Sequence, residues 1–221
     1  MKRLLSITLM TLVAVLAVSA QQYKYEVGPT LGLTGYLGES NNGMLFKHPG
    51  FTLGGLFRYN HNSRWAFKTN LNYGHLIGDT KDDLSQYPDG ATHKVSSHVI
   101  DLGVTAEFNF LNFGRGPAYK KYKPISPYMV AGAGFAIAIC NGVHDSFILP
   151  IGVGVKYKFK EKINLGFEFT MRKEFNDRID GLSDLYDIPH SFAKNTDWYS
   201  FAMFTASFEF GKRCIKCNYI E

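Results

Sequence analysis

Charged side chains alternate with apolar ones along residues 163–175, which read INLGFEFTMRKEF. The odd positions up to Met171 are apolar, whereas the even positions are small, polar or charged. Carboxylates and cations on one face of a strand can act as acid and base, or they can form ion pairs. A soluble sandwich would turn this polar face to water, and a membrane barrel would enclose it. The direction of the polar face therefore bears directly on the fold.

Two of the three cysteines form a Cys-x-x-Cys pair, Cys214 and Cys217, near the C-terminus. Lys212, Arg213 and Lys216 flank the pair, and since cations favour the thiolate, a redox-active pair is one interpretation. Half of a zinc site is a second interpretation, although two further ligands are not evident. A local disulfide in an oxidising compartment, or a pair of idle thiols, is the third. Cys214 and Cys217 are therefore a possible disulfide.

The histidines and serines show no spacing that predicts a catalytic or metal site. The seven histidines lie at positions 48, 61, 75, 93, 98, 144 and 190, mostly in expected loops or at strand ends. Ser97 and His98 are adjacent, but neighbours on a strand face opposite ways and cannot pair as nucleophile and base. The sequence therefore predicts no enzyme, no metal and no cofactor. The enzymatic alternative is a lipid-modifying barrel with a catalytic Ser/His pair at its rim.

Eight segments show the two-residue period of β-strands, and none shows a convincing helical period. They are residues 23–38, 50–60, 64–78, 98–110, 127–139, 147–159, 163–175 and 197–210. The fifth segment is apolar and small on both faces, so its orientation cannot be assigned. Phe, Tyr and Trp make up 15% of the chain and 22 residues are glycine, which is typical of tightly packed strands.

The connections between these segments alternate between long and short. Residues 39–49, 79–97, 140–146 and 176–196 are expected to form loops at one rim, with tight turns at 61–63 and 161–162 at the other. This alternation is typical of an up-and-down outer-membrane barrel, although the connection at 111–126 is too long for a plain periplasmic turn. The prediction is an all-β, eight-stranded antiparallel transmembrane β-barrel, OmpA-like, with a lumen filled by side chains.

The N-terminus has the features of a secretory signal peptide. Lys2 and Arg3 precede an apolar run from Leu4 to Leu16, and small residues around Ala20 suit cleavage. The run is shorter than the ~20 apolar residues that span a bilayer. We expect a cleaved signal peptide (1–20), an outer-membrane barrel (21–211) and a short periplasmic tail with the Cys-x-x-Cys pair (212–221).

A barrel of eight strands has room only for side chains, and enclosed charges must be paired. The predicted interior network consists of charged residues on the polar strand faces: Glu26, Arg58, Lys68, Asp101, Glu107, Lys156, Glu168, Arg172 and Glu209. Its expected role is structural, leaving no permanent pore; a channel lining or a catalytic cluster is the functional alternative. The net charge of +5 is scattered along the chain and does not indicate nucleic-acid binding.

Several segments together resemble the PorG-type outer-membrane barrels of Bacteroidetes. The resemblance begins with YEVGPTLGLTGYLGE and HPGFTLGGLFRYNHNSRWAFKTNLNYGHLIGD. It continues through IDLGVTAEFNFLNFG, LPIGVGVKYKF and LGFEFTMRKEFNDRIDGLSDLY, and it ends with DWYSFAMFTASFEFGK. It spans essentially the whole mature chain. It implies an eight-stranded barrel that belongs to the type IX secretion system and associates with a periplasmic ring of a lipoprotein and a partner protein.

Two functions from different classes follow. The first is a non-enzymatic structural component, integral to the bilayer of the outer membrane, that anchors the periplasmic ring through its turns, the 111–126 connection and the tail. The alternative is a small barrel that binds or modifies lipid or a small molecule at its outer rim.

Overall fold

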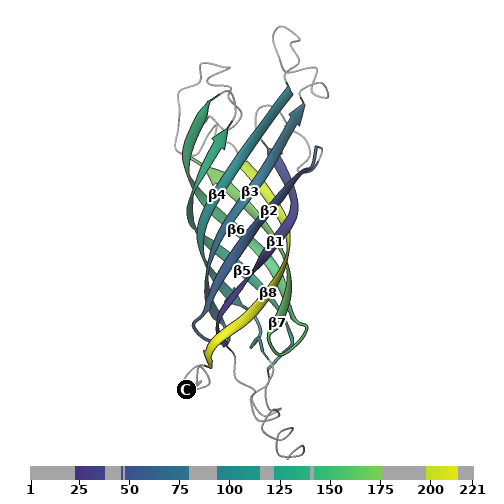
Figure 1. Cartoon of the computed structure of the whole chain (residues 1–221), viewed down its shortest axis with the longest axis vertical. Helices are drawn as coiled ribbons and strands as arrows, with labels where there is room; N and C mark the ends of the chain where they lie inside the picture. The colour runs from purple at the N-terminus through teal and green to yellow at the C-terminus, as the bar shows by residue number, and fades with distance from the viewer. Residues whose placement is uncertain are drawn as a thin grey trace, which may run out of the picture.

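The protein is a closed β-barrel of eight antiparallel strands arranged in sequence order, with the last strand paired to the first (Figure 1). This computed structural model describes residues 23–37, 46, 48–79, 94–114, 122–139, 142–175 and 198–213. The arrangement confirms the predicted fold class. Within these ranges no helix has the length and apolar character needed to cross a membrane.

The strands tilt around the axis of the barrel (Figure 1). They are β1 (Tyr23–Leu37), β2 (Gly50–Asn60), β3 (Trp65–Asp79), β4 (Lys94–Asn109), β5 (Ile125–Ile139), β6 (Val143–Lys158), β7 (Ile163–Glu174) and β8 (Trp198–Arg213). The short connections after β2 and β6 lie at one end, here called the turn end, and the opposite end is called the loop end.

Several strands are longer than the alternation predicts. β4 and β6 begin at Lys94 and Val143, so parts of the expected loops at 79–97 and 140–146 are strand. The cause is the backbone ladder, because pairing continues to Asp79 with Lys94 and to Ile139 with Val143. β8 likewise ends at Arg213, where it pairs with Tyr23, so the expected barrel–tail boundary after 211 falls inside a strand. Backbone pairing can extend a strand beyond the segment in which side chains alternate.

The polar face of each strand points into the barrel. In β7, Glu168 and Arg172 are each 1% exposed, whereas Phe167, the neighbour of Glu168, is 42% exposed on the outer wall. The same alternation places Leu31 and Phe67 outside at 57% and 48% exposure. An apolar outer wall around a polar interior is the pattern of a transmembrane barrel, the reverse of a soluble sandwich.

The lumen is filled differently at its two ends. Charged side chains fill the turn end, whereas buried apolar side chains gather toward the loop end. This apolar cluster consists of Leu76, Val99, Ala136, Ala138, Ile148, Tyr199, Phe201 and Met203. Inward-facing glycines make room for large rings. A Cβ on Gly154 would lie 2.5 Å from Cζ of Tyr128, and one on Gly74 would lie 3.1 Å from the ring of Phe201.

Candidate functional site

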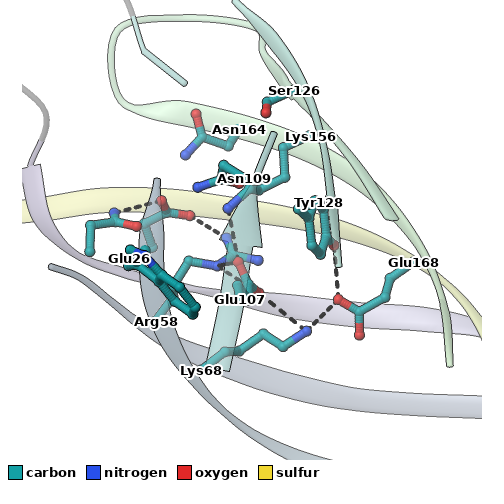
Figure 2. A network of polar contacts seen from close by, with 12 residues as sticks. Glu26, Arg58, Lys68, Glu107, Asn109, Ser126, Tyr128, Lys156, Asn164 and Glu168 are labelled. Carbon is teal, nitrogen blue, oxygen red and sulfur yellow. Dashed lines mark hydrogen bonds and ion pairs between the residues drawn. The ribbon is translucent and has the colours of Figure 1, made fainter. Parts of the chain in front are cut away.

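Glu107 of β4 is the centre of the charged region at the turn end of the lumen (Figure 2). Its carboxylate lies 3.0 Å from Nε of Arg58, 3.3 Å from Nζ of Lys68 and 2.8 Å from Nζ of Lys156. Arg58 lies on β2, Lys68 on β3 and Lys156 on β6, so one carboxylate ties four strands together. All four side chains are buried, which strengthens each interaction and makes the loss of any partner costly.

Two further carboxylates complete the shell around these cations. Arg58 donates from Nη1 to Oε2 of Glu26 over 2.6 Å, and the amide of Asn60 donates to the other oxygen over 2.8 Å. On the far side, Lys68 bridges Glu107 and Glu168 (Figure 2). The hydroxyl of Tyr128 donates to Oε2 of Glu168 over 2.8 Å. Nearly every group in this region therefore has a partner of opposite charge or a hydrogen-bond partner.

A further ion pair lies nearest the turns. Lys158 pairs with Glu209, whose Oε1 also accepts a hydrogen bond of 2.8 Å from Nδ2 of Asn164. The buried charges of this region are hereafter called the charge network: Glu26, Arg58, Lys68, Glu107, Lys156, Lys158, Glu168 and Glu209. It holds four cations and four carboxylates, so its formal charge is zero.

Phe113, from the connection between β4 and β5, is 0% exposed although it lies outside the strands. The amines of Lys156 and Lys158 lie 5.3 and 5.5 Å from its ring centroid, within the range of a cation–π contact. The backbone around it is fixed by hydrogen bonds from Gly114 N to Lys123 O (3.0 Å) and from Lys158 N to Pro124 O (2.7 Å). The long connection thus packs an aromatic ring against the charge network.

A separate ion pair lies nearer the loop end, among the apolar cluster. Nε of Arg172 is 2.7 Å from Oδ2 of Asp101, and the hydroxyl of Tyr199 donates to the same oxygen over 2.9 Å. The guanidinium carbon of Arg172 lies 4.0 Å from the ring centroid of Phe201. This pair, hereafter the buried pair, borders the apolar cluster, and Nη1 of Arg172 also donates to Oγ1 of Thr170. Glu174, also buried, lies on the same face of β7.

All nine residues of the predicted interior network are buried in the lumen. Seven of them lie in the charge network, and Asp101 and Arg172 form the buried pair. The sequence pattern indicates no role for Tyr128, because the orientation of its segment cannot be assigned. It indicates none for Phe113 either, because loops have no alternation. A usable signal for Tyr128 was the alternation of Ser126 and Tyr128 with Pro127 and Met129. Cys214 and Cys217 lie outside the described residues.

The ion pairs of this arrangement join side chains from several strands across the lumen. The carboxylates of the charge network are buried, and each of them contacts at least one cation. Among the residues that the structure describes, no group of three or more His, Cys, Asp or Glu could hold a metal ion. The lumen therefore resembles a polar core that fixes the barrel's shape.

A closed barrel of eight strands with an apolar outer wall and an ion-paired interior defines a membrane β-barrel. The chain belongs to a family described as "Domain of unknown function (DUF6089)", whose sequence model matches residues 2–219. A search of curated protein sequences finds no match.

Solved structures with a similar fold are bacterial barrels. The crystal structure of Neisserial surface protein A (NspA) has a TM-score of 0.52 at 12% identity, with 84% of this chain and 97% of that chain covered. The N-terminal β-barrel domain of Pseudomonas aeruginosa OprF has a TM-score of 0.46 at 17% identity, with 86% and 100% covered. The similarity to NspA supports the barrel fold.

Proposed function

We propose that this protein is an integral outer-membrane barrel that acts as a non-enzymatic scaffold for a periplasmic assembly. The assembly is the ring of a lipoprotein and its partner protein in a type IX secretion machine, as the resemblance to PorG-type barrels implies. The observation that carries the proposal is the ion-paired, buried filling of the lumen. Because side chains fill the interior of such a barrel, its rims are the surfaces that remain for binding partners.

The turn end offers a suitable surface for such a partner. Short turns face the periplasm in outer-membrane barrels. The described residues 61–64, 110–114, 122–125 and 159–163 of this end carry four exposed cations and one exposed carboxylate, namely Arg64, Lys123, Lys160, Lys162 and Glu161. Within the β4–β5 connection, Phe113 is buried, and backbone hydrogen bonds join Gly114 to Lys123 and Lys158 to Pro124. The excess of positive charge on these described residues favours a partner with an acidic face.

A crosslinking pull-down from outer membranes, read by mass spectrometry, tests this function. Tagged wild-type protein should recover the ring lipoprotein and its partner protein. The charge-reversal variant Arg64→Glu/Lys123→Glu/Lys160→Glu alters exposed groups only, so it should insert normally and recover much less of both. Asp145→Lys, an exposed reversal at the loop end, is the matched control and should recover the wild-type amount. Undiminished recovery by the triple variant would contradict the proposed surface, and no recovery by wild type would contradict the function.

Lipid handling is the second candidate, and one feature of the outer wall favours it. An apolar groove of about 680 Å³ crosses β1, β2 and β3, where Gly55 lacks a side chain between Leu53, Phe57 and Leu71. A wall in contact with lipid can seat an acyl chain in such a groove. Wild-type protein that carries bound lipid and no periplasmic partner in the same experiment would support this candidate instead. Replacing Gly55 with Leu should then fill the groove and reduce the co-purified lipid.

A further inference from the structure

Two histidines from neighbouring strands lie side by side on the outer wall near the loop end. His75 of β3 and His98 of β4 are direct partners in the strand register. Their ring centroids are 4.8 Å apart and the ring planes differ by 20°. The two histidines are distant in sequence, so no spacing motif predicts that they meet. The antiparallel pairing of β3 with β4 brings them together.

Tyr73 holds the ring of His98. Its hydroxyl oxygen lies 2.7 Å from Nδ1 of His98, and the two rings are stacked with centroids 5.9 Å apart. With Nδ1 engaged, Nε2 is the ring nitrogen that His98 can offer to a ligand. Metal-binding histidines commonly donate the proton of their other ring nitrogen to an oxygen, which fixes the tautomer and the ring orientation. Tyr73 is placed to accept that hydrogen bond.

The position of the pair gives it access to water. His75 is the eleventh residue of β3, and a tilted strand crosses the hydrocarbon in about 9–11 residues. β3 and β4 extend furthest at the loop end of the barrel (Figure 1). The side chain of His98 is exposed and that of His75 is partly exposed. Both imidazoles therefore lie at the outer edge of the membrane span, within reach of dissolved ions.

We propose that His75 and His98 together bind one divalent transition-metal ion, with Tyr73 as the positioning residue for His98. Imidazole suits Cu²⁺, Ni²⁺ and Zn²⁺, and the general affinity order places Cu²⁺ above the other two. The torsion that turns a histidine ring is broad, so the His75 ring can rotate out of the stack while Tyr73 retains His98. Two protein nitrogens then bind the ion, and water fills its remaining positions.

Cu²⁺ titration of the full-length barrel in detergent micelles, followed by electron paramagnetic resonance, tests the site. At one equivalent, the wild-type spectrum should show coupling to two imidazole nitrogens. His75→Gln and His98→Gln should each remove one nitrogen and raise the dissociation constant. Tyr73→Phe should retain both nitrogens but bind about tenfold more weakly, the loss expected for an outer-shell partner. Zn²⁺ should displace Cu²⁺ from the wild-type protein when in large excess.

His144→Gln is the matched control, because His144 is a partly exposed histidine on another strand and should leave the spectrum and affinity unchanged. Heat-modifiable mobility on gels shows that each variant is folded, so lost binding cannot be assigned to an unfolded barrel. Two results would overturn the proposal. One is a wild-type spectrum without two-imidazole coupling, and the other is retention of that coupling and of wild-type affinity in both histidine variants.

Discussion

The charge network and the buried pair show two ways of holding charges inside one narrow barrel. Glu107 contacts three cations from three strands, and two of its cations contact further carboxylates. Asp101, by contrast, contacts Arg172 and the hydroxyl of Tyr199 amid apolar neighbours. Removing a charge that several ions share leaves each of those ions buried with one partner fewer. Both members of a simple ion pair, by contrast, can be replaced together. The network should therefore resist stepwise replacement, and the pair should not.

The largest effect is expected for Glu107→Gln. This change leaves Arg58, Lys68 and Lys156 buried with one carboxylate fewer, so the free energy of unfolding should fall by about 5 kcal/mol, the upper part of the range for breaking a buried ion pair. Urea titration in lipid vesicles, monitored by tryptophan fluorescence, measures it. Glu161→Gln, in an exposed turn, should change stability by less than about 0.5 kcal/mol. A loss for Glu107→Gln as small as that of the control would remove the distinction between network and pair.

A somewhat smaller loss is expected for Phe113→Ala. Truncating a buried phenylalanine typically costs about 3–5 kcal/mol, and here the cation–π contacts with Lys156 and Lys158 are lost as well. We expect a loss of about 3 kcal/mol, the lower end of this range, in the same urea titration. Leu111→Ala, which truncates a residue that is 38% exposed in the same connection, is the control and should cost far less. Equal losses for the two variants would show that Phe113 is not part of the core.

The smallest net effect is expected when the whole buried pair is replaced. Arg172→Met alone leaves the carboxylate of Asp101 buried without its cation and should lower the free energy of unfolding by about 3 kcal/mol. The combined variant Asp101→Leu/Arg172→Met/Tyr199→Phe removes both charges and the hydroxyl, and its stability should lie within about 1 kcal/mol of wild type. The apolar cluster around the pair is the reason, since it can pack against the new side chains. A loss of stability in the combined variant equal to the sum of the losses for Asp101→Leu, Arg172→Met and Tyr199→Phe measured separately would contradict this expectation.

Replacing two members of the charge network together should not restore stability. Glu107→Gln combined with Arg58→Met still leaves Lys68 and Lys156 short of a carboxylate. The combined variant should therefore remain at least as unstable as Glu107→Gln alone, measured in the same titration. Recovery toward wild-type stability would mean that Glu107 and Arg58 behave as an isolated pair.

Most of the architecture could be predicted from the sequence because a two-residue period is a local property. Alternation in residues 163–175 identifies a strand and places Glu168 and Arg172 on one face. The strand ends were less predictable. β4 and β6 continue into segments without clear alternation because backbone pairing, rather than side-chain burial, defines their ends.

The pairing of charges could not be predicted, because it depends on how the sheet closes. Lys68 and Glu168 come from β3 and β7, which are not neighbours in the barrel, and they meet only across the lumen. Alternation shows that both side chains point inward but says nothing about their relative height. Phe113 was missed for a different reason: it acts from a connection, where no periodic pattern marks a buried side chain.

We infer that the lumen is a structural core with no permanent pore. Electrical recording of the purified wild-type barrel in planar lipid bilayers tests it most directly, with insertion verified by protease protection in matched vesicles. We expect the inserted protein to produce no regular unitary conductance steps, because buried ion-paired and apolar side chains line the described length of the lumen. Stable, uniform conductance steps from the inserted wild-type protein would contradict it.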